Sequence, residues 1–151
     1  MADSTTQAIT WRADFATGVG IMDDQHRVLV KMLNEASTQL SDTSPLTEYE
    51  SVVKGLLGYA GYHFQTEEKL MAEYGYEKNK AVPAAEHIKA HRGFAEKVVM
   101  TQDQLKAGKR IPKDDLVSFL TDWLTDHILH TDKELGAYLR DKMAQTAAGK
   151  T

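Results

Sequence analysis

The sequence contains no cysteine among its 151 residues. This absence excludes disulfide bonds, zinc sites with thiolate ligands and iron–sulfur clusters, so any metal must be held by nitrogen and oxygen atoms. Only three prolines and ten glycines occur, and no stretch has the composition of a linker between domains. We therefore expect a single domain over residues 1–151, of which 143–151 form a disordered tail.

A dominant charge of one sign and a long apolar run are also missing. The formal net charge is −4 with both signs mixed along the chain, so there is no basic stripe of the kind found on nucleic-acid-binding proteins. The longest nearly apolar stretch, GLLGYAGYHF, is far too short to span a bilayer, and the N-terminus lacks the pattern of a signal peptide. These features predict a cytoplasmic protein that neither binds nucleic acid nor inserts into membranes.

Apolar residues recur at spacings of three and four in four long stretches, and no segment alternates convincingly like a strand. The pattern predicts helices over about 22–40, from after SPLTEYE to Tyr74, from near Pro83 to Leu105, and from Pro112 to about Lys142. Long helices with short connections favour an all-α fold, an antiparallel up-down-up-down four-helix bundle.

Five of the six histidines lie on the inward stripes of these helices, with at least one on each helix. They are His26, His63, His87, His91 and His127, and Glu67 continues the stripe of His63. Buried polar groups need partners, so five ordinary core histidines are hard to explain. In such a bundle the starts of odd helices lie beside the ends of even ones, which brings these groups to one level. The arrangement predicts a metal site inside the bundle.

This ligand set is too large for one ion, because a tetrahedral zinc site uses four ligands. Five imidazoles, two bridging carboxylates and a bridging oxo or hydroxo group fill all but one position of two octahedral ions. The open position suits a small ligand such as dioxygen, and imidazole–carboxylate sets with vacant positions favour iron among the redox metals. We therefore expect two iron ions (Fe²⁺/Fe³⁺) with a bridging oxo or hydroxo group.

The segment HILHTD, residues 127–132, raises the question of which of its two histidines faces the metal. A regular helix would turn His130 and Glu134 to one face, since they are four residues apart. The apolar stripe instead leads to His127 and resumes in phase with Asp132, five residues later. One extra residue accommodated as a π-bulge would join the two halves of the stripe. We predict such a bulge, with His127 and Asp132 inward and His130 partly exposed.

Taken in order, these motifs resemble the hemerythrins, and specifically the single-domain bacterial hemerythrins, over residues 11–140. The resemblance begins with an N-terminal aromatic arm within residues 1–20, around Trp11 and Phe15, and continues through GVGIMDDQH, HFQTEEKLM, HIKAH and HILHTD. The link GYEKNKAVPAAEH is longer than the family's usual connection. Carried over residue by residue, the resemblance implies two iron sites joined by two carboxylates. One iron would be held by His87, His91 and His127, the other by His26 and His63, and both by Glu67 and Asp132.

The resemblance also implies a function, the reversible binding of dioxygen for storage, delivery or buffering. The protein would be a monomer and not an enzyme, and an oxygen-consuming enzyme would receive the oxygen. An apolar pocket would hold the oxygen ligand, lined by Leu29, Phe64, Trp123, Leu124 and Ile128, while Phe94 belongs either to this lining or to the ordinary core. The alternatives are a di-iron oxidase, peroxidase or nitric-oxide-handling enzyme on the same scaffold, or an oxygen or redox sensor that acts through a partner.

Overall fold

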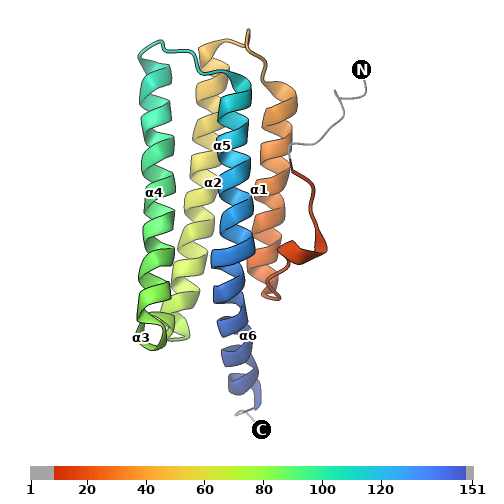
Figure 1. Cartoon of the computed structure of the whole chain (residues 1–151), viewed down its shortest axis with the longest axis vertical. Helices are drawn as coiled ribbons and strands as arrows, with labels where there is room; N and C mark the ends of the chain where they lie inside the picture. The colour runs from red at the N-terminus through yellow and green to blue at the C-terminus, as the bar shows by residue number, and fades with distance from the viewer. Residues whose placement is uncertain (1–8, 149–151) are drawn as a thin grey trace.

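The structure is a computed structural model that describes residues 9–148 of the chain. Its long helices pack side by side, and the chain runs alternately up and down through α1, α2, α4 and the rod formed by α5 and α6 (Figure 1). The elements are α1 (Gly20–Gln39), α2 (Leu46–Glu73), α3 (Tyr76–Asn79), α4 (Ala81–Lys106), α5 (Lys113–Asp126), a π-helix (His127–Asp132) and α6 (Lys133–Ala148). Within the described residues no strand occurs. The predicted all-α four-helix bundle is confirmed.

None of the helices in the described part of the chain is long and apolar enough to cross a membrane.

The ends of two predicted helices differ from expectation. Residues 143–148 of the expected disordered tail continue α6, while 149–151 lie outside the described residues. The alanine-rich sequence of this segment favours a helix, and Met143 packs against the buried core. The long link between the second and third predicted helices contains the short helix α3, which follows Gly75 in a left-handed conformation (φ 73°) at the end of α2.

The interior contains two separate apolar clusters, which we name the large cluster and the small cluster. The large cluster includes Leu29, Phe64, Phe94 and Leu124, and the small cluster includes Met22, Met71, Ala84 and Leu135. On every rod the predicted metal ligands lie in sequence between a residue of the large cluster and a residue of the small one. The fold therefore holds a layer of polar groups between two dry layers, where water cannot easily solvate them.

The N-terminal arm is fastened to the bundle at Thr17 and Gly18. The Asp23 carboxylate accepts hydrogen bonds from the Thr17 amide and hydroxyl, each at 2.8 Å, and from the Gly18 amide at 3.2 Å. Thr17 also passes directly over Gly136 of α6. A Cβ atom at position 136 would lie 2.7 Å from the Thr17 Cβ and 2.9 Å from its carbonyl oxygen. The close crossing of arm and helix therefore requires glycine at this position.

The Gly136→Ala variant is expected to be less stable than the wild type in urea denaturation. Overpacking against a backbone that Asp23 holds in place costs roughly 1–3 kcal/mol, which offsets the ~1 kcal/mol that alanine gains over glycine in a helix. Gly93→Ala is the matched control, because a Cβ at that helical position meets nothing within 4 Å. It should raise the free energy of unfolding. Equal stability of the two variants would contradict the close crossing.

Candidate metal centre

Seven polar side chains from all four rods converge between the two apolar clusters, and each is at most 4% exposed. They are His26 from α1, His63 and Glu67 from α2, His87 and His91 from α4, and His127 and Asp132 from the π-helix. These are the residues that the sequence predicts as ligands, and the structure brings all of them together. Their ligand atoms form two groups, in each of which the atoms lie within 4.8 Å of one another. The two groups share only the two carboxylates.

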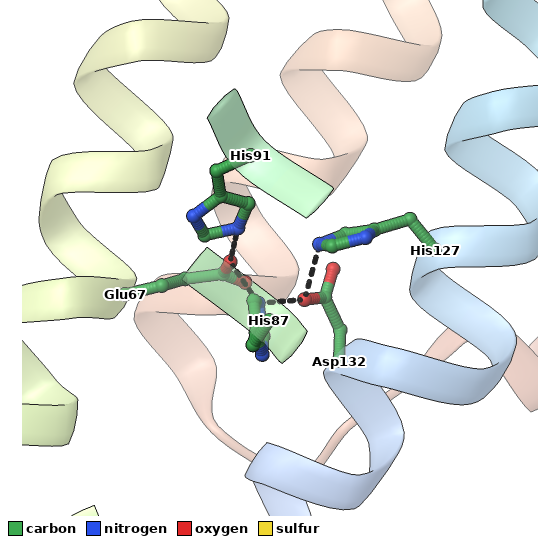
Figure 2. Close-up of side chains that lie close together, drawn as sticks. All are labelled: Glu67, His87, His91, His127 and Asp132. Atoms are coloured by element: carbon green, nitrogen blue, oxygen red, sulfur yellow. Dashed lines mark hydrogen bonds and ion pairs between the residues drawn. The ribbon is translucent and has the colours of Figure 1, made fainter. Parts of the chain in front are cut away.

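The Glu67 carboxylate divides its oxygens between the two groups. Its Oε1 faces His87 and His91 (Figure 2), at 3.2 Å from His87 Nε2 and 3.0 Å from His91 Nε2. Its Oε2 faces the other way, 3.1 Å from His63 Nε2 and 3.4 Å from His26 Nε2. Each oxygen therefore faces two imidazole nitrogens, which is the arrangement of a carboxylate placed between two cation positions.

The Asp132 carboxylate is divided in the same way on the opposite side. Its Oδ1 lies 3.1 Å from His87 Nε2 and 3.2 Å from His127 Nε2 (Figure 2). Its Oδ2 lies 2.8 Å from His26 Nε2. One group therefore has three imidazoles and the other two, and both carboxylates stand between them.

The π-helix is what aims Asp132 at this site. Residues His127–Asp132 form the predicted bulge, so both end residues point inward although they are five apart. His130 points outward with its side chain 73% exposed, and its Nδ1–H donates to the Asp126 carbonyl oxygen at 3.0 Å. The regular-helix alternative, with His130 and Glu134 inward, is wrong. The bulge also keeps Leu135 in the core at 0% exposure.

Charge within the site favours the protonated forms of His26 and His87 and the ionised forms of both carboxyls when no cation is present. Burial lowers the pKa of His26, but its contacts with Asp132 and Glu67 outweigh burial and raise this pKa to about 10. The same balance raises the pKa of His87 to about 9. Burial raises the pKa of both carboxyls, but the surrounding histidines reverse this effect and hold both pKa values well below the ordinary range.

Many of the atoms that face one another in this site lack hydrogen-bond partners, as expected of atoms that would bind a metal. Among the described residues, the buried side-chain nitrogen and oxygen atoms without a hydrogen bond belong to Thr121 and to six of the seven converging residues, all but His91. They include His63 Nε2, His127 Nε2 and both Asp132 oxygens. They approach one another without hydrogen-bond geometry. Buried donors and acceptors are rarely left in this state. Imidazole nitrogens and carboxylate oxygens pointing at two common positions fit a pair of transition-metal ions.

Aromatic rings hold two of the histidines from the side of the large cluster. Phe64 stacks on His91 with ring centroids 3.9 Å apart and planes at 11°, and Trp123 stacks on His127 at 4.4 Å and 13°. Both aromatic rings also line a small apolar cavity of about 20 Å³ next to the site. The walls of the cavity therefore contact His91 and His127 directly.

Most of the predicted pocket lining surrounds this cavity. Leu29, Phe64, Trp123 and Leu124 line it, as does Phe94, whereas Ile128 is fully buried in the large cluster and does not. Sequence reasoning missed the remaining lining residues, which are Leu33, Leu56, Ala60 and Leu120. They continue the ligand-bearing stripes one or two turns farther from the histidines. That periodic position is the signal that could have identified them.

Two other side chains that sequence reasoning missed contact the histidines from outside. Gln25 and Glu68 each lie next to a converging residue in the sequence, before His26 and after Glu67. Gln25 accepts a hydrogen bond from His63 and Glu68 accepts one from His91. Their position beside the motif residues gave only a weak signal, because neighbouring residues on a helix point in different directions.

Fold and site together define the class to which the protein belongs, that of four-helix bundles with an interior histidine–carboxylate metal centre. A comparison with protein families agrees with this description. The model of the hemerythrin HHE cation binding domain matches residues 17–139. The chain belongs to the hemerythrin family, whose members are di-iron, oxygen-binding proteins with non-heme iron.

Individual relatives match over most of their length. The chain is 33% identical over 132 residues to bacteriohemerythrin from Methylococcus capsulatus, covering 87% of this chain and 96% of that protein. It is 30% identical over 146 residues to bacteriohemerythrin from Pseudomonas aeruginosa, covering 95% and 89%. A crystal structure of wild-type hemerythrin superimposes with a TM-score of 0.76 at 31% identity, over 87% of this chain and 97% of that one.

Proposed function

We propose that this protein binds dioxygen reversibly at a pair of iron ions joined by an oxo or hydroxo group. His87, His91 and His127 hold one ion, His26 and His63 hold the other, and Glu67 and Asp132 bridge the two. The observation that supports this best is the division of both buried carboxylates between two histidine groups. We further take residues 1–151 to act as one domain, and the protein to be a monomer in the cytoplasm.

The unequal histidine groups determine where a ligand binds. When bound, an iron pair supplies the electrons that dioxygen binding requires and takes them back on release. The group of His26 and His63 has one imidazole fewer than the other, so an ion held there would have one protein ligand fewer and room for a small ligand. The chain itself contributes neutral imidazole ligands, two charge-balancing carboxylates and a dry surrounding. Leu29 and Leu124 are among the apolar residues that line the cavity and exclude water, which disfavours release of charged oxygen species.

The size of the cavity favours a carrier over an enzyme with an organic substrate. A space of about 20 Å³ holds roughly one water-sized molecule, so a diatomic gas fits and a larger substrate does not. The role we propose is oxygen storage, delivery or buffering, with an oxygen-consuming enzyme as recipient. Nitric oxide would also fit. A nitric-oxide-handling enzyme is therefore the alternative function that is equally compatible with the size of the cavity.

An oxygenation cycle tests the proposal. The iron-loaded protein, reduced anaerobically and then exposed to air, should contain two irons per chain and develop a visible charge-transfer band. Removal of oxygen should abolish this band, and repeated cycles should restore it. Irreversible conversion to the ferric form with release of peroxide would point to an oxidase instead. Turnover of added nitric oxide would point to the other enzyme, and one zinc per chain without iron would refute the binuclear centre.

A further inference from the structure

Side chains of different charge hold two of the histidines from behind. The Nδ1 atom of His91 lies 2.9 Å from Glu68 Oε2, whereas the Nδ1 atom of His63 lies 2.7 Å from Gln25 Oε1. Both histidines direct Nε2 toward Glu67, at 3.0 Å for His91 and 3.1 Å for His63. The two histidines thus have the same partner at Nε2, which faces the proposed metal site, and different partners at Nδ1.

Glu68 determines the tautomer of His91. An ionised carboxylate can only accept hydrogen bonds. In the neutral imidazole that binds a metal, the one proton must therefore be on Nδ1, which leaves the lone pair on Nε2. The carboxylate lies at the surface with its side chain 36% exposed, while the ring of His91 is 2% exposed. A charge at the edge of the bundle is therefore connected through one imidazole to the buried site.

Gln25 determines the tautomer of His63 by a longer chain of bonds. The Thr66 hydroxyl donates to the Tyr62 carbonyl at 3.2 Å, so it must accept the bond from Gln25 Nε2 at 3.1 Å. The amide of Gln25 is thereby oriented with its oxygen toward His63, whose Nδ1–H donates to it. Gln25 is buried and neutral. In their neutral forms both histidines present a lone pair to the site, but only the ring of His91 has a negatively charged acceptor at its Nδ1.

We propose that Glu68 is a charged positioning residue that makes the two metal positions unequal. A carboxylate that accepts the far N–H of a metal-bound imidazole fixes the orientation of the ring and increases its basicity. The ion at His87, His91 and His127 then has a more strongly donating ligand set than the ion at His26 and His63. Glu68 therefore stabilises the ferric over the ferrous state of the ion at the three-histidine position. The neutral amide of Gln25 gives the ion at the two-histidine position no such stabilisation. This inference rests on the proposed iron pair.

Four variants test the role of charge apart from the role of packing. Glu68→Gln keeps a hydrogen-bond acceptor and removes the charge, and Glu68→Asp keeps the charge. Glu73→Gln is the matched control, because it removes the same charge from the same helix at an exposed position. Gln25→Glu is the reciprocal variant and places a carboxylate behind His63. Circular dichroism establishes the helical content of each, and metal analysis gives the iron content per chain.

The first measurement is an anaerobic redox titration of each iron-loaded variant with mediator dyes. Glu68→Gln should shift the ferrous-to-ferric ratio at the wild-type midpoint about tenfold toward the ferrous state, because the ion loses a nearby negative charge. Glu73→Gln should have the same ferrous-to-ferric ratio as the wild type. The ratio of Glu68→Asp should lie closer to the wild-type ratio than that of Glu68→Gln does. Gln25→Glu should shift the ratio toward the ferric state. The second measurement is chelator-driven loss of Co²⁺, which for Glu68→Gln should be about 10- to 100-fold faster at one of the two positions.

Two results would overturn the role of Glu68. In the first, Glu68→Gln has the redox ratio of the wild type. In the second, Glu68→Gln and Glu73→Gln shift it equally, so that only the overall charge of the protein matters. A wild-type protein that holds fewer than two irons would instead refute the proposed function. The two failures are therefore distinguishable.

Discussion

Replacement of His127 by alanine is expected to remove at least one of the two irons per chain, whereas His130→Ala should leave both in place. The two histidines are three residues apart on the same rod, but the π-helix turns His127 inward and leaves His130 73% exposed. Loss of a direct ligand should weaken metal binding more than the roughly 10- to 100-fold that follows from losing a residue behind a ligand. In the described structure the hydrogen bond and the ion pair of the His130 side chain are both made with Asp126, so its removal should leave the site unchanged.

Iron content after anaerobic loading and dialysis measures this difference. His130→Ala serves as the internal control, because both variants remove an imidazole from the same six-residue segment. Their far-ultraviolet circular dichroism should remain alike, so that any difference in iron reflects the site. Iron loss from His130→Ala with full retention in His127→Ala would mean that the segment is a regular helix in solution.

The fold and the convergence of the seven polar residues were predictable because both depend on the period of the α-helix. Apolar residues three and four apart show which face is buried, and polar residues such as His63 and Glu67 on that face must lie inside. The up-down topology then fixes their depth. Even the irregular segment was predictable, since the step of five from His127 to Asp132 interrupts an otherwise regular stripe.

Other features depend on side-chain directions that periodicity does not encode. Gln25 and Glu68 hold the histidines across helix–helix contacts. Gln25 on α1 accepts a hydrogen bond from His63, and Glu68 on α2 accepts one from His91. Such pairs depend on the rotation of each helix about its axis, which a stripe of apolar residues fixes only roughly. Ile128 illustrates the same limit. It is fully buried, but the π-helix turns it into the large cluster and away from the cavity wall.

Removal of the metal is expected to lower the thermal stability substantially, and by more at alkaline than at slightly acidic pH. A metal at about 1,000 times its dissociation constant stabilises the folded state by about 4 kcal/mol. For a protein of this length each kcal/mol corresponds to roughly 2–4 °C, so the melting temperature should fall by roughly 8–16 °C. The metal-free protein buries like charges and unpaired donor atoms together, and bound cations would neutralise and pair them.

The pH dependence follows from the direction of the histidine pKa values. Without metal the pKa of His26 is raised to about 10 and that of His87 to about 9, above the unfolded value near 6.5. Their contribution to stability is therefore complete below about pH 6.5 and is lost as the pH rises through these raised values. Glu67 and Asp132 have depressed pKa values, so their contribution is present at neutral pH and is lost only in acid.

Metal affinity, in contrast to the stability of the metal-free protein, should rise with pH. Only neutral imidazoles bind metal, so loading must displace the histidine protons. Raising the pH removes this competition while it weakens the metal-free state, so both effects widen the gap between the loaded and the metal-free protein. Melting temperatures of the two forms under argon at about pH 6 and about pH 8.5 measure the gap. An indicator dye in weak buffer should also record about two protons released per chain at neutral pH. A gap that does not widen with rising pH would show that the buried histidines are already neutral in the metal-free protein.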